Sequence, residues 1–259
     1  MKIALVGYGK MGHLLRSVAE SKGHTVAVTI DPAAPDADVK TAPGDAQAVS
    51  RAVKSAGVQG IIEFSHPSAV MGNIKALLPL GIPMVVGTTG WDAQVDEVAA
   101  LAASCGGVLL HSSNYSIGVN MFFKIVQEAA KLLQPFSEYD TAVWEMHHNQ
   151  KADSPSGTAL EIARRVMASN PAKTKLVTDA FHERPAADEL HVSSTRCGTV
   201  PGTHTVFFDS AADTIELTHR ARSREGFAAG AVYSLEKLVQ GVQDGTFKRG
   251  QLYTTDSIF

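Results

Sequence analysis

The sequence predicts an α/β protein: an N-terminal Rossmann-type parallel sheet plus a second α+β domain with an open mixed sheet. Three observations carry this prediction. Short apolar runs alternate with helical patterns over residues 1–117, as in successive βαβ units. A glycine-rich turn joins the first apolar run to the first helical pattern. After residue 133 the alternation stops, and strand-like segments follow with few helices between them.

Length and composition are ordinary for a globular protein. The chain has 259 residues, 44% of them hydrophobic and 19% charged, which suffices for two modest domains. A net charge of −3 gives no general attraction to nucleic acid or to anionic membranes. Cys105 and Cys197 suggest no disulfide framework. With no signal-peptide pattern and no apolar run long enough to span a bilayer, we expect a cytoplasmic protein.

A dinucleotide-binding fingerprint follows the first predicted strand, residues 2–6 (KIALV), and opens a helical pattern. Gly7 permits the tight turn, Gly9 lets the backbone approach a pyrophosphate, and Gly12 lets the helix pack closely on the strand. The whole G-x-G-x-x-G motif is therefore a candidate cofactor site. Its residues are Gly7, Tyr8, Gly9, Lys10, Met11 and Gly12.

Asp31 closes the second predicted strand, residues 24–30. It follows Gly12 at about the 20-residue spacing at which an acidic side chain hydrogen-bonds the adenosine ribose. We therefore expect residues 1–117 and 227–259 to form a dinucleotide-binding domain. A Rossmann fold that binds no cofactor is the alternative.

The residues around Asp31 also bear on the choice of cofactor. Its carboxylate would repel a 2′-phosphate, and Pro32-Ala33-Ala34 offers no arginine to accept one. Lys10 partly offsets this repulsion. We expect NADH to be preferred, with NADPH as the other possible cofactor.

The remaining segments of the first domain continue the alternation. Residues 32–46 form a loop rich in Pro, Ala and Asp. Ligands of parallel sheets bind at the carboxyl ends of the strands. Gly90 and the run 112–116 fall at that edge, although the G-T-T-G turn at 87–90 also fits a simple loop. The expected helices cover residues 48–53, 66–77 and 95–103, and the expected strands residues 60–65, 83–86 and 108–110.

The second domain, residues 118–226, begins with an amphipathic helical pattern at 120–133. Strands then dominate, and a final amphipathic helix is expected at 228–242. Phe207, Phe208 and Ile215 are interpreted as core or interface residues. The expected strands cover residues 139–146, 176–177, 190–195, 202–209 and 214–218.

One polar segment of this domain, residues 144–160 (WEMHHNQKADSPSGTAL), gathers groups that suit chemistry. It has the pattern of a strand end, a polar loop and a helix start, with Ser154, Pro155 and Ser156 as N-cap and first-turn residues. N–H groups at a helix start bind carboxylates or phosphates, and Gly157 allows a close approach. The segment therefore predicts an anion-binding site.

Proton donors lie in the same segment. His147 and His148 can exchange protons near neutral pH, and Lys151 adds a positive charge. Each residue alone also fits a surface or packing role, but their density favours a functional site. No metal is expected, because the segment has neither HExxH nor CxxC spacing.

The run E-x-H-H-x-x-K-x-D-x-P-S-G-T-A, residues 145–159, resembles the signature of the 4-hydroxy-tetrahydrodipicolinate reductase (dihydrodipicolinate reductase) family. Residues 87–91 are similar to the family's G-T-T-G segment, which lines the nicotinamide. Residues 112–120 are similar to its A-x-N-F-S-x-G-V-N segment, with Tyr115 in place of the usual Phe. The resemblance covers nearly the whole chain. It implies further cofactor contacts by Gly87, Thr88, Thr89, Ser112, Ser113, Asn114 and Tyr115.

The same resemblance implies the reaction: NAD(P)H-dependent reduction of a cyclic dicarboxylic imine, 4-hydroxy-tetrahydrodipicolinate, in lysine and diaminopimelate biosynthesis. His147 would donate the proton that follows hydride transfer, with Lys151 stabilising or sharing that role. His148 and the N–H groups of Gly157 and Thr158 would bind the substrate carboxylates. Arg196 and His204 are interpreted as structural.

The family's homotetramers, formed through the second domain, imply a homotetramer here. The crossings near Ile117 and Gly226 are predicted hinges, at which the domains would close on the ligand. Two other classes remain open. Another nicotinamide dehydrogenase should lack the E-x-H-H-x-x-K run, and a non-catalytic dinucleotide sensor would leave the histidines and the lysine idle.

Overall fold

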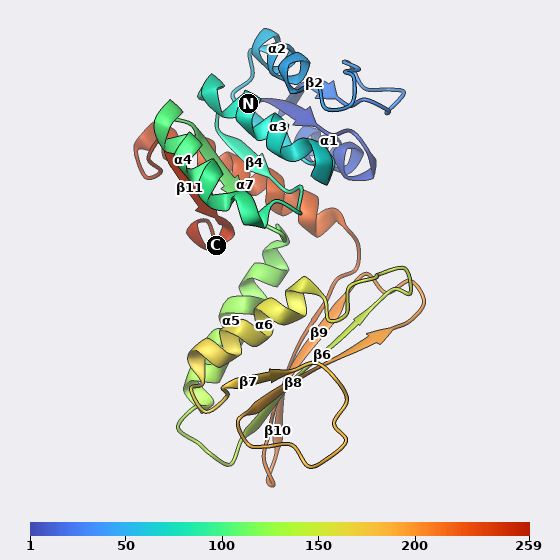
Figure 1. Ribbon diagram of the computed structural model, residues 1–259, viewed down its shortest axis with the longest axis vertical. Helices are drawn as coiled ribbons and strands as arrows, with labels where there is room; N and C mark the ends of the chain where they lie inside the picture. The colour runs from blue at the N-terminus through green and yellow to red at the C-terminus, as the bar shows by residue number, and fades with distance from the viewer. The chain divides into compact units, whose positions relative to one another are not determined.

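The computed structural model describes all 259 residues and divides into two compact units (Figure 1). Unit 1 comprises residues 1–117 and 225–259, and unit 2 comprises residues 118–224. The chain therefore leaves unit 1 once and returns to it through the last long helix. No helix has both the length and the apolar character that crossing a membrane requires.

Unit 1 contains a six-stranded sheet in the order β11-β5-β4-β3-β1-β2, and every neighbouring pair is parallel. This arrangement confirms the predicted Rossmann-type sheet. Its strands are β1 Lys2–Val6, β2 Thr25–Ile30, β3 Gly60–Glu63, β4 Met84–Val86, β5 Val108–His111 and β11 Gln251–Thr254. Its helices are α1 Lys10–Ser21, α2 Ala46–Ala56, α3 Pro67–Leu77, α4 Val95–Cys105 and α7 Glu225–Asp244, with short 3₁₀ turns at Leu78–Leu80, Asp92–Gln94 and Thr255–Ser257.

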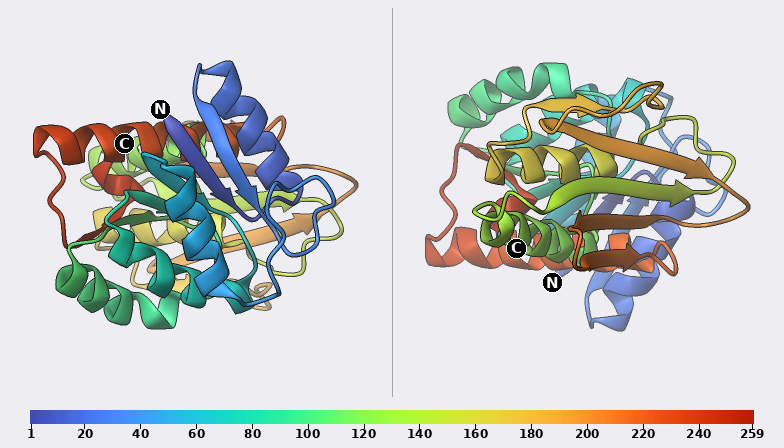
Figure 2. Two further views of the ribbon diagram at one scale, coloured as in Figure 1. Left: turned by 90° about the horizontal axis from the view of Figure 1, so that it is seen from above. Right: turned by 90° about the horizontal axis from the view of Figure 1, so that it is seen from below.

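Apolar side chains on both faces of this sheet are covered by helices (Figure 2, left). Helices α2, α3 and α4 pack on one face, and α1 and α7 pack on the other. The sequence patterns predicted these helices but missed β11, which pairs with β5 at the sheet edge. A four-residue segment, QLYT, is too short to show a strand period on its own.

Unit 2 contains a mixed five-stranded sheet in the order β10-β9-β6-β8-β7. Strand β6 is parallel to β8 and antiparallel to β9, as the predicted open mixed sheet requires. Helices α5 and α6 cover one face of this sheet (Figure 1). The elements are α5 Ile117–Leu133, β6 Asp140–His147, α6 Gly157–Ser169, β7 Lys175–Val177, β8 Glu189–Arg196, β9 Thr203–Asp209 and β10 Thr214–Arg220.

The alternation of β6 decides which of its side chains face the helices. Val143 belongs to the core beneath α5 and α6, and Glu145 and His147 follow it on the same face. Trp144 and Met146 point to the opposite face and are only half-buried. Phe208 is a core residue of the helix-covered face, as predicted.

The start of α6 differs from the predicted one. The helix begins at Gly157, and Ser156 is its N-cap, with its hydroxyl accepting a hydrogen bond from Ala159 N–H at 3.2 Å. Ser154 and Pro155 therefore lie before the cap rather than in the first turn. Only one side chain can occupy the cap position, and Ser156 is the one whose oxygen reaches the N–H group.

Candidate active site

Two glycines of the unit 1 motif, Gly7 and Gly12, are required by close packing, whereas Gly9 faces open space. A Cβ at Gly7, where φ is +91°, would lie 2.1 Å from the carbonyl oxygen of Phe64, and a Cβ at Gly12 would lie 2.5 Å from that of Gly7. At Gly9, the N-cap of α1, a Cβ would meet nothing within 4 Å, and no side chain caps the helix. Gly9 thus leaves the N-terminal N–H groups of α1 open to a ligand, as a bound pyrophosphate requires.

The other residues of the motif surround this opening. Lys10 begins α1 and is exposed, Met11 is half-buried, and Tyr8 is buried in the core. The backbone N–H of Tyr8 donates to Asp31 Oδ2 at 2.8 Å, while Oδ1 accepts from the N–H groups of Ala33 and Ala34 at 2.8 Å each.

Asp31 is therefore an ionised anchor between two loops. Partial burial opposes its charge, but the three backbone N–H donors outweigh that effect and hold the pKa of the carboxyl below its usual value. A cavity of about 450 Å³ opens beside it, lined by residues that include Gly9, Asp31, Thr41, Asp45 and His66. The lining contains two carboxylates and neither Lys nor Arg.

Glu63 joins the ends of β3 and β4 below the G-T-T-G turn. Its carboxylate is fully buried and accepts hydrogen bonds from Thr88 Oγ1 at 2.6 Å, from Asn73 Nδ2 at 3.0 Å and from the Ser65 hydroxyl. Thr88 Oγ1 also accepts from Ser65 N–H at 2.7 Å. The Thr88 hydroxyl therefore hydrogen-bonds groups of the protein itself, and the sequence analysis did not predict this network. The sign of this network in the sequence is a single acidic residue, Glu63, within the apolar run GIIEF.

The rest of the turn divides in the same way. A Cβ at Gly87 would lie 2.0 Å from the ring of Phe64, so this glycine is required by packing. Thr89 and Gly90 are exposed.

The run 112–115 is held mainly by its own hydrogen bonds. Ser112 Oγ donates to Asn114 O at 3.0 Å, Asn114 is buried, and Ser113 is exposed. The Tyr115 ring is only 2% exposed, and its hydroxyl donates to the carbonyl of Val86 at 2.8 Å. The ring is therefore held inside the core, where its hydroxyl finds its acceptor.

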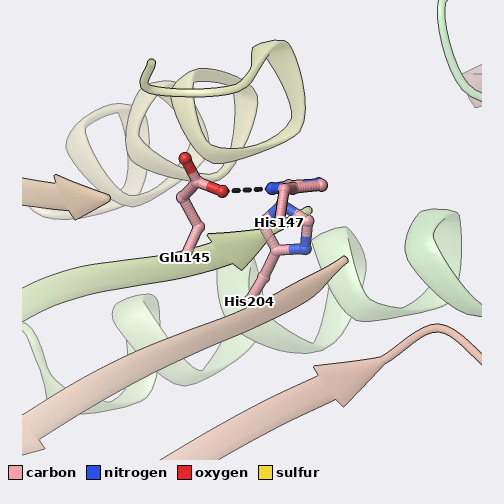
Figure 3. A group of neighbouring side chains, drawn as sticks. All are labelled: Glu145, His147 and His204. Atoms are coloured by element: carbon pink, nitrogen blue, oxygen red, sulfur yellow. Dashed lines mark hydrogen bonds and ion pairs between the residues drawn. The ribbon is translucent and has the colours of Figure 1, made fainter. Parts of the chain in front are cut away.

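Unit 2 brings His147 into contact with Glu145 (Figure 3). His147 is the last residue of β6, and its Nδ1 hydrogen-bonds the carboxylate of Glu145, two residues earlier on the same face. Arg196, the register partner of His147 on β8, donates to Glu145 Oε1 at 2.8 Å. Ser156 N–H donates to the same oxygen at 3.3 Å. Burial opposes the charge of Glu145, but these donors prevail and lower its pKa to about 2.

His204 and Gly202 enclose the ring of His147. The His204 ring lies edge-on to that of His147, with 5.2 Å between centroids (Figure 3). Nε2 of His204 is 3.3 Å from Ser156 Oγ. Burial, then the charge of His147, lowers the pKa of His204 to about 3, so His204 is neutral. At Gly202 a Cβ would lie 2.9 Å from His147 Nε2. Glycine therefore leaves that nitrogen accessible.

Lys151 lies on the loop between β6 and α6. Its Nζ is 2.8 Å from Asp153 Oδ1. Arg196 Nε donates to the carbonyl of Lys151 at 3.3 Å, and another guanidinium nitrogen donates to the carbonyl of Asp153. One arginine thus connects the predicted lysine to the carboxylate that holds His147. Sequence reasoning missed this role, and interpreted Arg196 only as structural.

The predicted carboxylate-binding residues follow on the same segment. His148 is half-buried, and its backbone N–H donates to Val200 O at 2.8 Å. Gly157, at the start of α6, is exposed, and a Cβ there would meet nothing within 4 Å. Thr158 follows it and is half-buried. No side chain crowds the N-terminus of α6 at Gly157, and the Gly157 N–H interacts with the Asp153 carboxylate there.

Glu145, His147 and His204 also lie close enough to hold a metal ion, with ligand atoms all within 4.8 Å of one another. Both oxygens of Glu145 already accept hydrogen bonds, and the guanidinium of Arg196 contacts one of them. A second cation beside that guanidinium would be repelled. The arrangement favours a proton-transfer network over a metal centre.

Two family models together match nearly the whole chain: "Dihydrodipicolinate reductase, N-terminus" over residues 1–115 and "Dihydrodipicolinate reductase, C-terminus" over residues 118–256. Similar curated proteins carry the name 4-hydroxy-tetrahydrodipicolinate reductase. One from Christiangramia forsetii is 36% identical over 238 residues, covering 92% of each chain. One from Archaeoglobus fulgidus is 38% identical over 240 residues, covering 90% of this chain and 91% of the relative.

A solved structure with the same fold is the dipicolinate-bound dihydrodipicolinate reductase from Paenisporosarcina sp. TG-14. The TM-score is 0.76 at 20% identity, covering 100% of this chain and 99% of that one. At this identity the likeness establishes the fold alone.

Proposed function

The chain belongs to the dihydrodipicolinate reductase family, and from this premise we propose how its residues divide the reaction between them. The enzyme is an oxidoreductase that uses a nicotinamide cofactor to reduce 4-hydroxy-tetrahydrodipicolinate to tetrahydrodipicolinate in lysine and diaminopimelate biosynthesis. The observation that carries the division is the hydrogen-bonded network of Glu145, His147 and Arg196 beside the N-terminus of α6.

His147 is the proton donor. Its Nδ1 is bonded to Glu145, which leaves Nε2 as the nitrogen that faces a substrate. The ionised carboxylate of Glu145 orients the ring. The absence of a side chain at Gly202 keeps Nε2 accessible. When bound, the nicotinamide supplies hydride to a carbon of the substrate ring. His147 delivers the proton that neutralises the negative charge placed on the ring system.

The substrate carboxylates bind to the segment that follows. The backbone N–H of Gly157, at the start of α6, is the seat for one carboxylate, with Thr158 beside it. His148 and Lys151 supply the remaining hydrogen bonds and positive charge. Lys151 lies on the loop that Arg196 holds, and it assists His147 electrostatically.

NADH is the preferred cofactor. The cavity beside the glycine motif carries the ionised Asp31 and no lysine or arginine in its lining. A 2′-phosphate in this cavity would lack a cationic partner and would be repelled by Asp31. The pyrophosphate fits the open N-terminus of α1 at Gly9.

Unit 2 is also the oligomerisation unit, and the enzyme is a homotetramer. The sheet face opposite α5 and α6 presents half-buried Trp144, Met146 and Phe207, which apolar contact with another copy would cover. The family resemblance favours association through this unit.

Absorbance of the reduced nicotinamide tests the function. The cyclic imine is generated enzymatically in the cuvette, and NADH consumption is followed with and without it. We expect NADH to be oxidised only when the imine is present. Cofactor binding without oxidation would identify a dinucleotide sensor instead.

A further inference from the structure

We infer that Arg196 is a positioning residue for the reaction: it holds the ring of His147 through Glu145, and the loop of Lys151 through backbone carbonyls. This inference rests on the proposed function. It replaces the interpretation of Arg196 as a merely structural residue with a specific task, which is to fix two reacting groups in one frame.

The first link runs through a buried carboxylate. Glu145 is 0% exposed, and Arg196 lies in register with His147 on the neighbouring parallel strand. The guanidinium donates to Oε1 at 2.8 Å, while His147 bonds Oε2. Both oxygens are held, so the carboxylate cannot rotate and the imidazole keeps one orientation.

The second link runs through the loop. The remaining guanidinium donors bond the carbonyl oxygens of Lys151 and Asp153, and one further bond at 2.9 Å ties Arg196 to its own strand at Thr195 O. The planar fork of arginine satisfies these acceptors together, whereas the single ammonium of a lysine cannot.

The contact between Arg196 and Glu145 is an attraction between opposite charges. The groups around Glu145 are His147 on β6, Arg196 on β8, His204 on β9, and Lys151 with Asp153 on the loop. His204 is neutral, Lys151 is paired with Asp153, and Arg196 is the permanent cation in direct contact with the carboxylate. Without the guanidinium, the buried charge of Glu145 would lose its permanently positive partner.

A double-mutant cycle on the full-length enzyme tests the inference. Arg196→Met should lower kcat by about 10- to 100-fold, the loss typical of removing the outer partner of a functional histidine. The KM for the imine and the dissociation constant for NADH should stay within about threefold, because no binding group is removed. Arg164→Met is the matched control, since Arg164 pairs with Glu161 on the exposed side of α6, and it should keep the wild-type kcat.

The second arm is Glu145→Gln, alone and combined with Arg196→Met. If Arg196 acts through Glu145, the double variant should lose clearly less activity than the product of the two single losses. Circular dichroism checks folding, and Arg196→Lys replaces Arg196→Met if the latter does not fold. We expect the lysine variant also to lose kcat, because it retains charge but not the fork.

A kcat within about threefold of the wild type in the Arg196 variant, a loss confined to KM, or losses that multiply in the double variant would overturn the inference. The wild type provides the reference in every assay. If it fails to oxidise NADH with the imine, the proposed function and this inference both fall. If it is active and the Arg196 variant is too, only this inference falls.

Discussion

Gly202 faces the Nε2 edge of His147 so closely that a Cβ at position 202 would lie 2.9 Å from that nitrogen. Gly202 directly precedes β9 and has a φ of +151°, and its carbonyl accepts a hydrogen bond from Ala221 N–H at 2.9 Å. The residue that shapes the accessible side of His147 is therefore a glycine with no chemistry of its own.

Gly202→Ala should lower kcat, because the methyl group would either crowd Nε2 or displace the ring from Glu145. We expect a loss on the order of tenfold or more, about 1.4 kcal/mol in the activation free energy. Gly198→Ala is the matched control: Gly198 also has positive φ, at +53°, but a Cβ there would meet nothing within 4 Å. Steady-state kinetics and thermal unfolding of both variants separate crowding of His147 from backbone strain. Equal kcat losses in the two would attribute them to backbone strain instead.

His147→Gln should lower kcat by about 10²- to 10⁴-fold, the usual range for losing a general acid. Its affinity for NADH should hardly change, because His147 lies in unit 2 and the glycine motif lies in unit 1. Kinetics and a cofactor titration on the same preparation check both points. A kcat within about threefold of the wild type would show that Lys151 or a bound water donates the proton.

His148→Ala should mainly raise KM for the imine, the pattern expected when a ground-state binding contact is lost. Its backbone, just beyond β6, is held by the hydrogen bond to Val200, so the substitution should leave the fold intact. Initial rates over a range of imine concentrations give KM and kcat separately. A large fall in kcat at unchanged KM would move His148 from binding into the chemistry.

The wild-type enzyme should have a higher kcat/KM with NADH than with NADPH, because Asp31 is ionised and no cation lines its cavity. Replacing Asp31 by Asn should narrow the difference by removing the repulsion of the 2′-phosphate. Assays with NADH and NADPH on the same preparation give the ratio of the two kcat/KM values. A wild-type preference for NADPH on the order of 100-fold, about 2.7 kcal/mol, would contradict this prediction.

Glu145 should contribute to stability in a pH-dependent way. Its pKa is lowered from the usual 4.5 of a glutamate to about 2, so the folded state favours the charged form. This contribution is present above about pH 4.5 and is lost as the pH falls towards about 2, with an upper value of about 3 kcal/mol. Urea unfolding of the wild type and of Glu145→Gln at several pH values measures the gap between them. A gap that stays constant from neutral pH into this acid range would contradict the prediction.

Patterns local to the chain were enough to predict much of this protein. The glycine motif, the period of the apolar residues and the polar segment 144–160 are each contained in a short stretch. They predicted the strands and helices of unit 1 except β11, and the mixed sheet of unit 2, and they carried the family resemblance. Local propensity and periodicity act over one or two turns of chain, so these features can be read without tertiary contacts.

Tertiary structure alone decided which side chains meet. Arg196 lies 51 residues from Glu145, and their contact depends on the parallel register of β6 and β8. The burial of the Tyr115 ring depends on where the carbonyl of Val86 lies, 29 residues earlier. Strand register and burial are set by how whole helices and strands pack together, and no single segment of sequence specifies that packing. For this reason the sequence suggested His147 and Lys151 as candidates, whereas the contacts that Glu145, Arg196 and Gly202 make around them emerged only from the tertiary structure.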